Sequence, residues 1–156
     1  IITMFHVLEH MPRPIETFQL LWSHLNETGH LLIEVPNIMT ADASPHNIFF
    51  KAHIYYFSAA TLYACASPYF DPVLTDDGSN LRVLFKRKPR EANITQPRQD
   101  DVLHIMRRLR QKGWLEYLFI GGGMFKSFFK LRNLVRESQY SGQSGKEILD
   151  DILGRT

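Results

Sequence analysis

The sequence has one cysteine, Cys65, and this excludes a framework of internal disulfides. A single thiol is typical of a reducing compartment, so we expect a cytoplasmic protein. The sequence also lacks an apolar run of the roughly 18–20 residues that a membrane-spanning helix needs. No basic segment leads into a short apolar stretch, as it does in a secretory signal. We therefore expect neither a membrane partner nor a signal peptide.

A strong excess of one charge is also missing, because 18 Lys and Arg oppose 16 Asp and Glu. The charge is unevenly spread: residues 1–97 carry nine acids and seven bases, and residues 98–156 carry seven acids and eleven bases. A solvated helical tail explains this distribution, and a weak site for an acidic partner is the alternative. Basic and aromatic residues do not interleave as they do in known nucleic-acid modules, so we do not expect a nucleic-acid partner.

The first third of the chain predicts a strand, a helix and a second strand. Residues 1–7 and 31–35 are apolar and β-branched, as in buried strands. Residues 14–26 between them repeat apolar side chains at helical spacing, with Pro14 in the first turn and Gly29 as the expected C-cap. Two strands joined by a helix are expected to be parallel neighbours.

The rest of the chain predicts a helix, a hairpin and a helical tail. Ser58 is a good N-cap for a helix over residues 59–66, and strands at 70–75 and 81–86 flank a turn that contains Gly78. The fold class expected is therefore α/β over residues 1–88. A linker at residues 89–97 and a helical extension at 98–156 follow, with helices expected at 100–112, 124–136 and 146–153.

Polar side chains of the kinds used in catalysis and metal binding follow both early strands. His6, Glu9 and His10 come after the first strand, and Asn37 comes after the second. Ligands of open α/β sheets bind beyond the carboxyl ends of the strands, so we expect both sets to face one crevice.

Three segments together resemble class I S-adenosylmethionine-dependent methyltransferases: Phe5-His-Val-Leu-Glu-His-Met-Pro12, Gly29-His-Leu-Leu-Ile-Glu-Val-Pro-Asn37 and Ala52-His-Ile-Tyr-Tyr-Phe-Ser58. The likeness is nearest to the ubiquinone-biosynthesis O-methyltransferase branch and covers residues 1–88. It implies the C-terminal part of a Rossmann-like methyltransferase sheet, with two parallel strands and a terminal antiparallel hairpin. The first three strands and the Gly-rich cofactor loop would then be absent, and we expect the chain alone to bind S-adenosylmethionine weakly or not at all. The glycines at 121–123 are expected to break a helix.

The resemblance also implies roles for individual residues. The segment of Phe5, His6, Val7 and Leu8 would line the methionine side of the cofactor, largely through its backbone. A small-molecule acceptor, methylated on oxygen or carbon, would lie against Asn37, His46, Phe50 and Tyr55. Packing in the core or in a lid is the alternative for the aromatic residues.

Two histidines are candidate catalytic bases, because an imidazole pKa of about 6.5 suits proton transfer. These are His10 and His53, and a purely structural hydrogen bond that fixes the aromatic loop is an equal alternative for His53. Some relatives of the ubiquinone type hold a divalent metal at a Glu/His pair in this place, which here is Glu9 and His10, with a further carboxylate supplied from elsewhere in the protein. For Glu9, a carboxylate stabilised by the dipole of a nearby helix is the alternative.

Two other function classes deserve comparison. His6, Glu9 and His10 match the H-x-x-E-H pattern of one class of zinc peptidase, which needs both histidines on one helix. A strand before the motif and prolines after it leave little room for such a helix. The chain could instead be a non-catalytic interaction module that self-associates through the free edge of strand 1–7 or through the helical tail.

Overall fold

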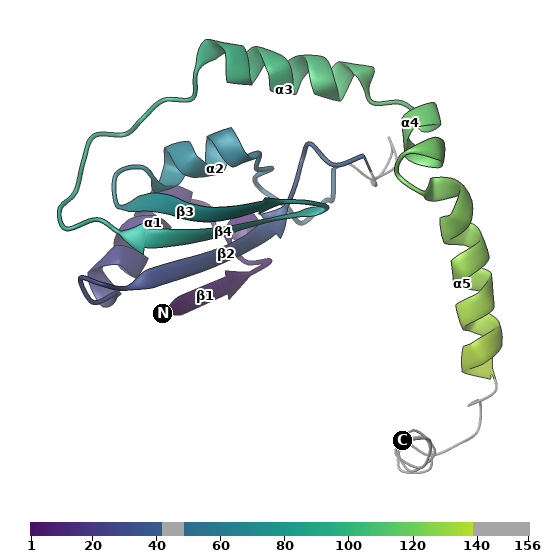
Figure 1. Cartoon of the computed structure of the whole chain (residues 1–156), viewed down its shortest axis with the longest axis horizontal. Helices are drawn as coiled ribbons and strands as arrows, with labels where there is room; N and C mark the ends of the chain where they lie inside the picture. The colour runs from purple at the N-terminus through teal and green to yellow at the C-terminus, as the bar shows by residue number, and fades with distance from the viewer. Residues whose placement is uncertain (42–48, 139–156) are drawn as a thin grey trace, which may run out of the picture.

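The computed structural model describes residues 1–41 and 49–138. The fold is α/β, with a four-stranded mixed sheet in the order β1-β2-β4-β3 (Figure 1). The parallel pair is β1 (Ile2–Phe5) and β2 (His30–Pro36), and α1 (Pro14–His24) joins them. This confirms the strand–helix–strand unit and the parallel pairing expected from the sequence.

The first strand is shorter than expected, because the backbone turns sharply at His6. His6 has a φ of 52°, which is left-handed and cannot continue a strand. Its backbone N–H still donates to the Glu34 carbonyl at 2.9 Å, and a short 3-10 helix, η1 (Leu8–His10), follows. The turn therefore directs the residues after β1 away from the line of the strand.

Gly29 does not cap α1 as expected, because the helix ends earlier, with Leu25 as its C-cap. The Gly29 N–H donates to the Asn26 carbonyl at 2.8 Å in the turn before β2. A Cβ at this position would lie 2.8 Å from that same oxygen and 2.9 Å from a methyl group of Leu25. Glycine is thus required here by close packing.

The second half of the sheet follows the expected pattern closely. Ser58 begins α2 (Ala59–Ala66) with a capping box, in which the Ser58 N–H donates to the Thr61 hydroxyl at 2.9 Å. Strands β3 (Phe70–Asp77) and β4 (Asn80–Arg87) form the antiparallel hairpin, and β4 also pairs antiparallel with β2.

One hydrophobic core lies between the sheet and the two helices. Alternate residues of β2 and β4 are fully buried, and Phe18 of α1 and Leu62 of α2 pack against the same face. The strand residues of this face are Leu31, Ile33, Val35, Leu81, Val83 and Phe85. Because successive side chains of a strand point to opposite faces, this alternation turns one face of β2 and β4 towards the core.

Residues 88–98, which follow β4, form neither a helix nor a strand. Three helices come after them in the described part of the chain. These are α3 (Gln99–Gln111), α4 (Trp114–Phe119) and α5 (Gly123–Ser138). The sequence patterns did not predict α4. Gly122, with a φ of 68°, separates α4 from α5, which confirms the expected helix break at the glycine cluster. The helix expected at 146–153 lies outside the described residues.

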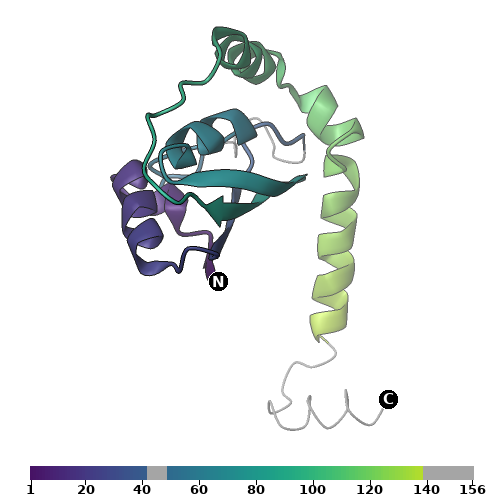
Figure 2. The ribbon, with the colours of Figure 1, turned by 60° about the vertical axis from the view of Figure 1, so that its left-hand side comes forward.

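The extension touches the sheet domain near the end of β2. The Arg108 guanidinium donates to the Met39 carbonyl at 3.5 Å, and the Lys112 ammonium contacts the Thr40 carbonyl. Beyond these contacts α5 stands apart from the sheet in both views of the ribbon (Figures 1 and 2). None of the helices that the structure describes is long and apolar enough to cross a membrane.

Candidate functional site

The turn at His6 places Glu9 in the interior of the protein. The Glu9 side chain is 1% exposed, and its neighbour Leu8 belongs to the hydrophobic core. Neither carboxylate oxygen of Glu9 receives a hydrogen bond from the residues that the structure describes. A charged group in this state is costly, since each buried ion loses several kcal/mol of hydration unless it is well paired. Glu9 therefore marks a site where a cationic group is favoured.

A second segment of the chain, residues 50–57, covers Glu9. We call it the aromatic segment. The backbone N–H groups of Ile54 and Tyr55 donate to the Glu9 carbonyl at 2.9 and 3.1 Å. The Tyr55 hydroxyl donates to the Pro12 carbonyl at 3.2 Å. These bonds hold the aromatic segment against η1, although the two are far apart in sequence.

This docking brings together Glu9, His10 and His53. One ligand atom from each lies within 4.8 Å of the others. The His53 Nε2 atom is 3.9 Å from a Glu9 oxygen. The ring centroids of His10 and His53 lie 5.0 Å apart in an edge-to-face arrangement. His6 approaches the same carboxylate, with its Nδ1 atom 3.3 Å from the oxygen. Four of the residues singled out in the sequence thus form one cluster.

The protonation of the two clustered histidines follows from their surroundings. The Nδ1 atom of His10 is 2.8 Å from the Ala52 carbonyl, which can only accept, so Nδ1 carries a proton and Nε2 is the atom that could ligate a metal. Burial lowers the pKa of His53 below its ordinary value; the Glu9 carboxylate opposes this shift, and His10 and His6 add to it when they are protonated. The neutral form of His53, which offers a lone pair, is therefore favoured.

The donor set fits a divalent cation. Two neutral imidazoles and a carboxylate are the ligands that zinc uses in open sites. The bond from His10 to a backbone carbonyl is the support that ligating histidines usually have. Ligand atoms of a tetrahedral zinc ion lie about 3.4 Å apart, so the longest separation in the cluster would have to close by roughly 1.4 Å. The third ligand is a histidine, whereas the sequence led us to expect a carboxylate beside Glu9 and His10.

A network of polar side chains extends from His6 towards the surface, and sequence reasoning missed it. The His6 Nε2 atom is 3.0 Å from a Glu34 oxygen, and the Arg82 Nε donates to the other oxygen at 2.5 Å. Arg82 also donates to Asp76 at 3.0 Å. The hydrogen bond from Arg82 is the main reason why the pKa of Glu34 lies below its ordinary value. Glu34, Arg82 and Asp76 are direct cross-strand partners, so only the strand register could have revealed them.

The residues expected to line the cofactor lie at the end of β1. Phe5 is half-exposed, His6 is accessible beside Glu34, and Val7 is partly buried. The Leu8 side chain is fully buried in the core, so only its backbone could contribute to a cofactor site. The cofactor role of this segment remains a prediction.

The residues expected to contact the acceptor do not all lie together. The Asn37 amide is buried and donates to Asp77 at 2.7 Å and to the Gly78 carbonyl at 2.9 Å, so a substrate contact would have to replace a bond to the hairpin turn. Phe50 is exposed and lies 5.0 Å from the His53 ring, and Tyr55 is partly exposed. His46 lies outside the described residues.

The zinc-peptidase arrangement does not form. It needs His6 and His10 on one helix, but η1 contains only three residues and His6 precedes it with a left-handed backbone. The partner of Glu9 and His10 is His53, which comes from the aromatic segment.

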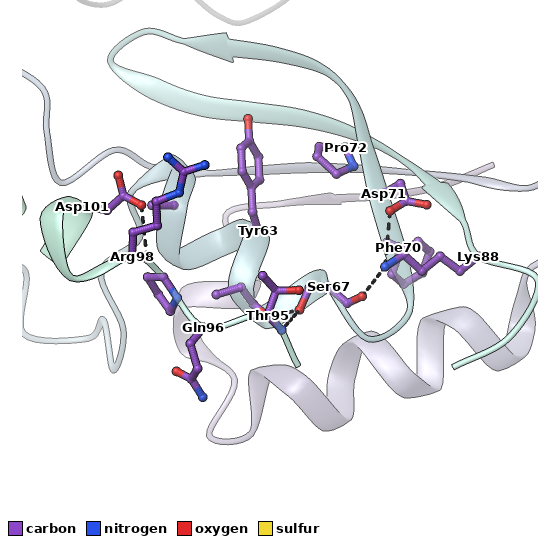
Figure 3. A pocket seen from close by; sticks show the side chains of 13 residues that line it. Tyr63, Ser67, Phe70, Asp71, Pro72, Lys88, Thr95, Gln96, Arg98 and Asp101 are labelled. Atoms are coloured by element: carbon purple, nitrogen blue, oxygen red, sulfur yellow. Dashed lines mark hydrogen bonds and ion pairs between the residues drawn. The ribbon is translucent and has the colours of Figure 1, made fainter. Parts of the chain in front are cut away.

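A separate pocket of about 480 Å³ lies between α2, the start of β3 and the segment before α3 (Figure 3). It is at the opposite end of the sheet from Asn37, because Phe70 pairs with Arg87 and Pro36 pairs with Asn80. Its polar groups already bind one another: Lys88 pairs with Asp71 at 3.3 Å, and the Thr95 N–H donates to the Ser67 hydroxyl at 2.7 Å. None of the site residues predicted from the sequence lines it.

Comparison with known proteins supports one family. The family described as "Methyltransferase domain" matches residues 1–68, a range that includes β1, η1, β2, the aromatic segment and α2. The match supports a methyltransferase domain in this part of the chain and methyl transfer as the class of reaction. It does not distinguish the ubiquinone-related branch from others. No curated protein matches the chain.

Proposed function

We propose that this chain carries one wall of the active site of an S-adenosylmethionine-dependent methyltransferase that acts on a small molecule. The observation that carries the proposal is the cluster of Glu9, His10 and His53 at the carboxyl edge of the parallel strands. The domain match over residues 1–68 supports the reaction class. Ligands of open α/β sheets bind at this edge, so the position of the cluster agrees with the proposed active site and with the domain match.

Two different segments would contact the cofactor and the acceptor. The segment from Phe5 to Leu8 would bind the methionine part of the cofactor, and the aromatic segment would cover the acceptor. Methyl transfer needs the acceptor, the methyl group and the sulfur in line, so positioning is the main contribution of the protein. The segment after β1 and the aromatic segment are hydrogen-bonded to each other at the Glu9 carbonyl, and such an arrangement is suited to that task.

Glu9, His10 and His53 would hold a divalent cation at the acceptor end. A bound cation supplies Lewis-acid chemistry, which makes an acceptor hydroxyl easier to deprotonate. The alternative expected from the sequence is that His10 or His53 takes the acceptor proton directly. Zinc uptake separates these roles, because only the first requires Glu9 as a ligand.

The cofactor part of the proposal can be tested by titrating the chain with S-adenosylhomocysteine and following backbone amides by NMR. We expect weak, millimolar binding, because no Gly-rich loop follows a strand among the described residues. The shifts should concentrate at residues 5–8, and adenosine alone should not reproduce them because it lacks the amino-acid part. Absence of shifts at these amides would contradict the cofactor site, and micromolar affinity would contradict the expected weak binding.

The bare edge of β1 favours a second candidate function, that of an interaction module. β1 is the outermost strand on its side of the sheet within the described residues. The His6 N–H bonds to β2, so by alternation the N–H groups of Thr3 and Phe5 point outward. An unpaired edge of this kind is a template for another strand.

If β1 pairs with a second copy, the chain should elute as a dimer in gel filtration with light scattering. Thr3→Pro should then give a monomer, because proline removes an outward N–H and is tolerated at an edge. Thr3→Val keeps the N–H and is the matched control, which should remain dimeric. A monomeric wild-type chain would exclude pairing between copies through β1.

A further inference from the structure

α5 exposes an apolar stripe along its length. Met124, Phe128, Leu131 and Val135 recur at the spacing of one helical face, and each is at least half-exposed. Phe128 is 63% exposed and Leu131 is 62% exposed. Such a face is unusual on a solvated helix, since apolar side chains normally pack against a core.

The opposite side of α5 carries lysines together with the aromatic ring of Phe129. At 3.6 residues per turn, Lys126 and Lys130 fall opposite the apolar stripe, and Arg132 falls at its border. The sequence of α5 contains four Lys and Arg and one acidic residue. A helix with an apolar stripe, aromatic residues and a basic polar side is suited to the interface of an anionic lipid bilayer.

The sheet domain leaves this stripe uncovered. α5 stands apart from the sheet in both ribbon views, and its main neighbour is α4 (Figures 1 and 2). α4 adds further exposed apolar residues at its end, where Phe119 is 68% and Ile120 is 76% exposed. The base of the extension is fixed by the pair of Arg108 and Glu116, in which one N–H donates at 2.8 Å.

We propose that α5 binds the surface of an anionic membrane, with the stripe of Met124, Phe128, Leu131 and Val135 in the headgroup region. Charge decides between a lipid surface and a second copy of the chain. Two copies paired through this helix would bring like charges together, whereas anionic lipids neutralise them. Arg132 at the border of the stripe lies nearest the lipid headgroups, whereas Lys126 and Lys130 contribute less, because the helix diameter of about 10–12 Å exceeds the Debye length of about 8 Å. The absence of long apolar runs argues only against helices that span a membrane. A helix that lies on the membrane surface does not need such a run.

The test is flotation of the full chain with two kinds of vesicle, phosphatidylcholine alone and phosphatidylcholine mixed with phosphatidylglycerol. We expect partitioning at least about tenfold stronger on the anionic vesicles. The double variant Phe128→Ser/Leu131→Ser should lose at least about tenfold on them, because two buried apolar side chains are removed. Arg132→Glu should lose about tenfold on anionic vesicles and little on neutral ones.

Two matched controls lie on the sheet domain. Leu20→Ser removes an exposed apolar side chain of α1, and Lys86→Glu reverses an exposed charge of β4. Both should float like the wild-type chain, and circular dichroism should show all variants folded. Equal binding to both vesicles, or no binding to either, overturns the proposal. So does sedimentation showing that the α5 variants dissociate a dimer, because the stripe would then be a contact between copies.

Discussion

Replacing Glu9 by glutamine is expected to weaken the uptake of zinc by this chain at least about 100-fold. Loss of a supporting residue behind a metal ligand typically costs 10–100-fold in affinity, so loss of a ligand should reach the upper limit or more. Glutamine keeps the shape of the side chain and removes its charge. Equilibrium dialysis with zinc at neutral pH measures the effect, with magnesium as the comparison ion.

The same substitution should act in the opposite direction on the metal-free protein. Glu9 is buried with neither oxygen hydrogen-bonded among the described residues. A buried charge without hydrogen bonds costs several kcal/mol even beside His6 at 3.3 Å, whereas an unpaired neutral amide costs about 1–3 kcal/mol. The variant should therefore be at least as resistant to heat as the wild type without zinc. At zinc concentrations about 100 times the dissociation constant, the wild type should gain about 2.7 kcal/mol that the variant lacks.

Glu16→Gln is the matched control for this experiment. Glu16 lies on the exposed part of α1, where it pairs with Arg13 at 3.2 Å, so its loss should leave zinc uptake unchanged. Equal zinc affinity in wild type and Glu9→Gln would show that Glu9 is not a ligand. A wild-type chain that takes up no zinc would leave proton transfer by His10 or His53 as the remaining role of the cluster.

Phe18→Ala is expected to destabilise the fold by about 3–5 kcal/mol, the usual cost of removing a fully buried aromatic ring. Phe18 is 0% exposed. Its ring centroid lies 5.9 Å from that of Phe70 and 6.0 Å from that of Phe85. It therefore joins α1 to both strands of the hairpin. Domains are typically stable by about 5–15 kcal/mol, so the loss could remove most of the folded population.

Urea unfolding followed by the fluorescence of the two tryptophans measures this effect. Ile15→Ala, a change at a partly exposed position of the same helix, should cost less than about 1 kcal/mol. Phe18→Leu keeps most of the volume and should cost clearly less than the alanine variant. If Phe18→Ala and Ile15→Ala were equally mild, the three rings would not form the centre of the core.

The helices and strands that depend on local sequence patterns could be predicted from the sequence. Alternation in β2 and β4, helical spacing in α1, and Ser58 at the start of α2 each reflect interactions within a few residues. α4 escaped prediction because its six residues are mostly apolar, and a short apolar run does not distinguish a helix from a strand. The end of β1 was misplaced because the left-handed turn at His6 has no reliable signal in a residue other than glycine.

The chemistry at the end of β1 shows where local information stops. The sequence by itself determined that His6, Glu9 and His10 follow a strand and that histidine and carboxylate chemistry is available there. Only the tertiary structure decided that His53 joins them and that Glu34 meets Arg82. Both depend on contacts between residues more than 40 positions apart. Such contacts are set by strand register and by the docking of the aromatic segment, which involve the packing of the whole sheet.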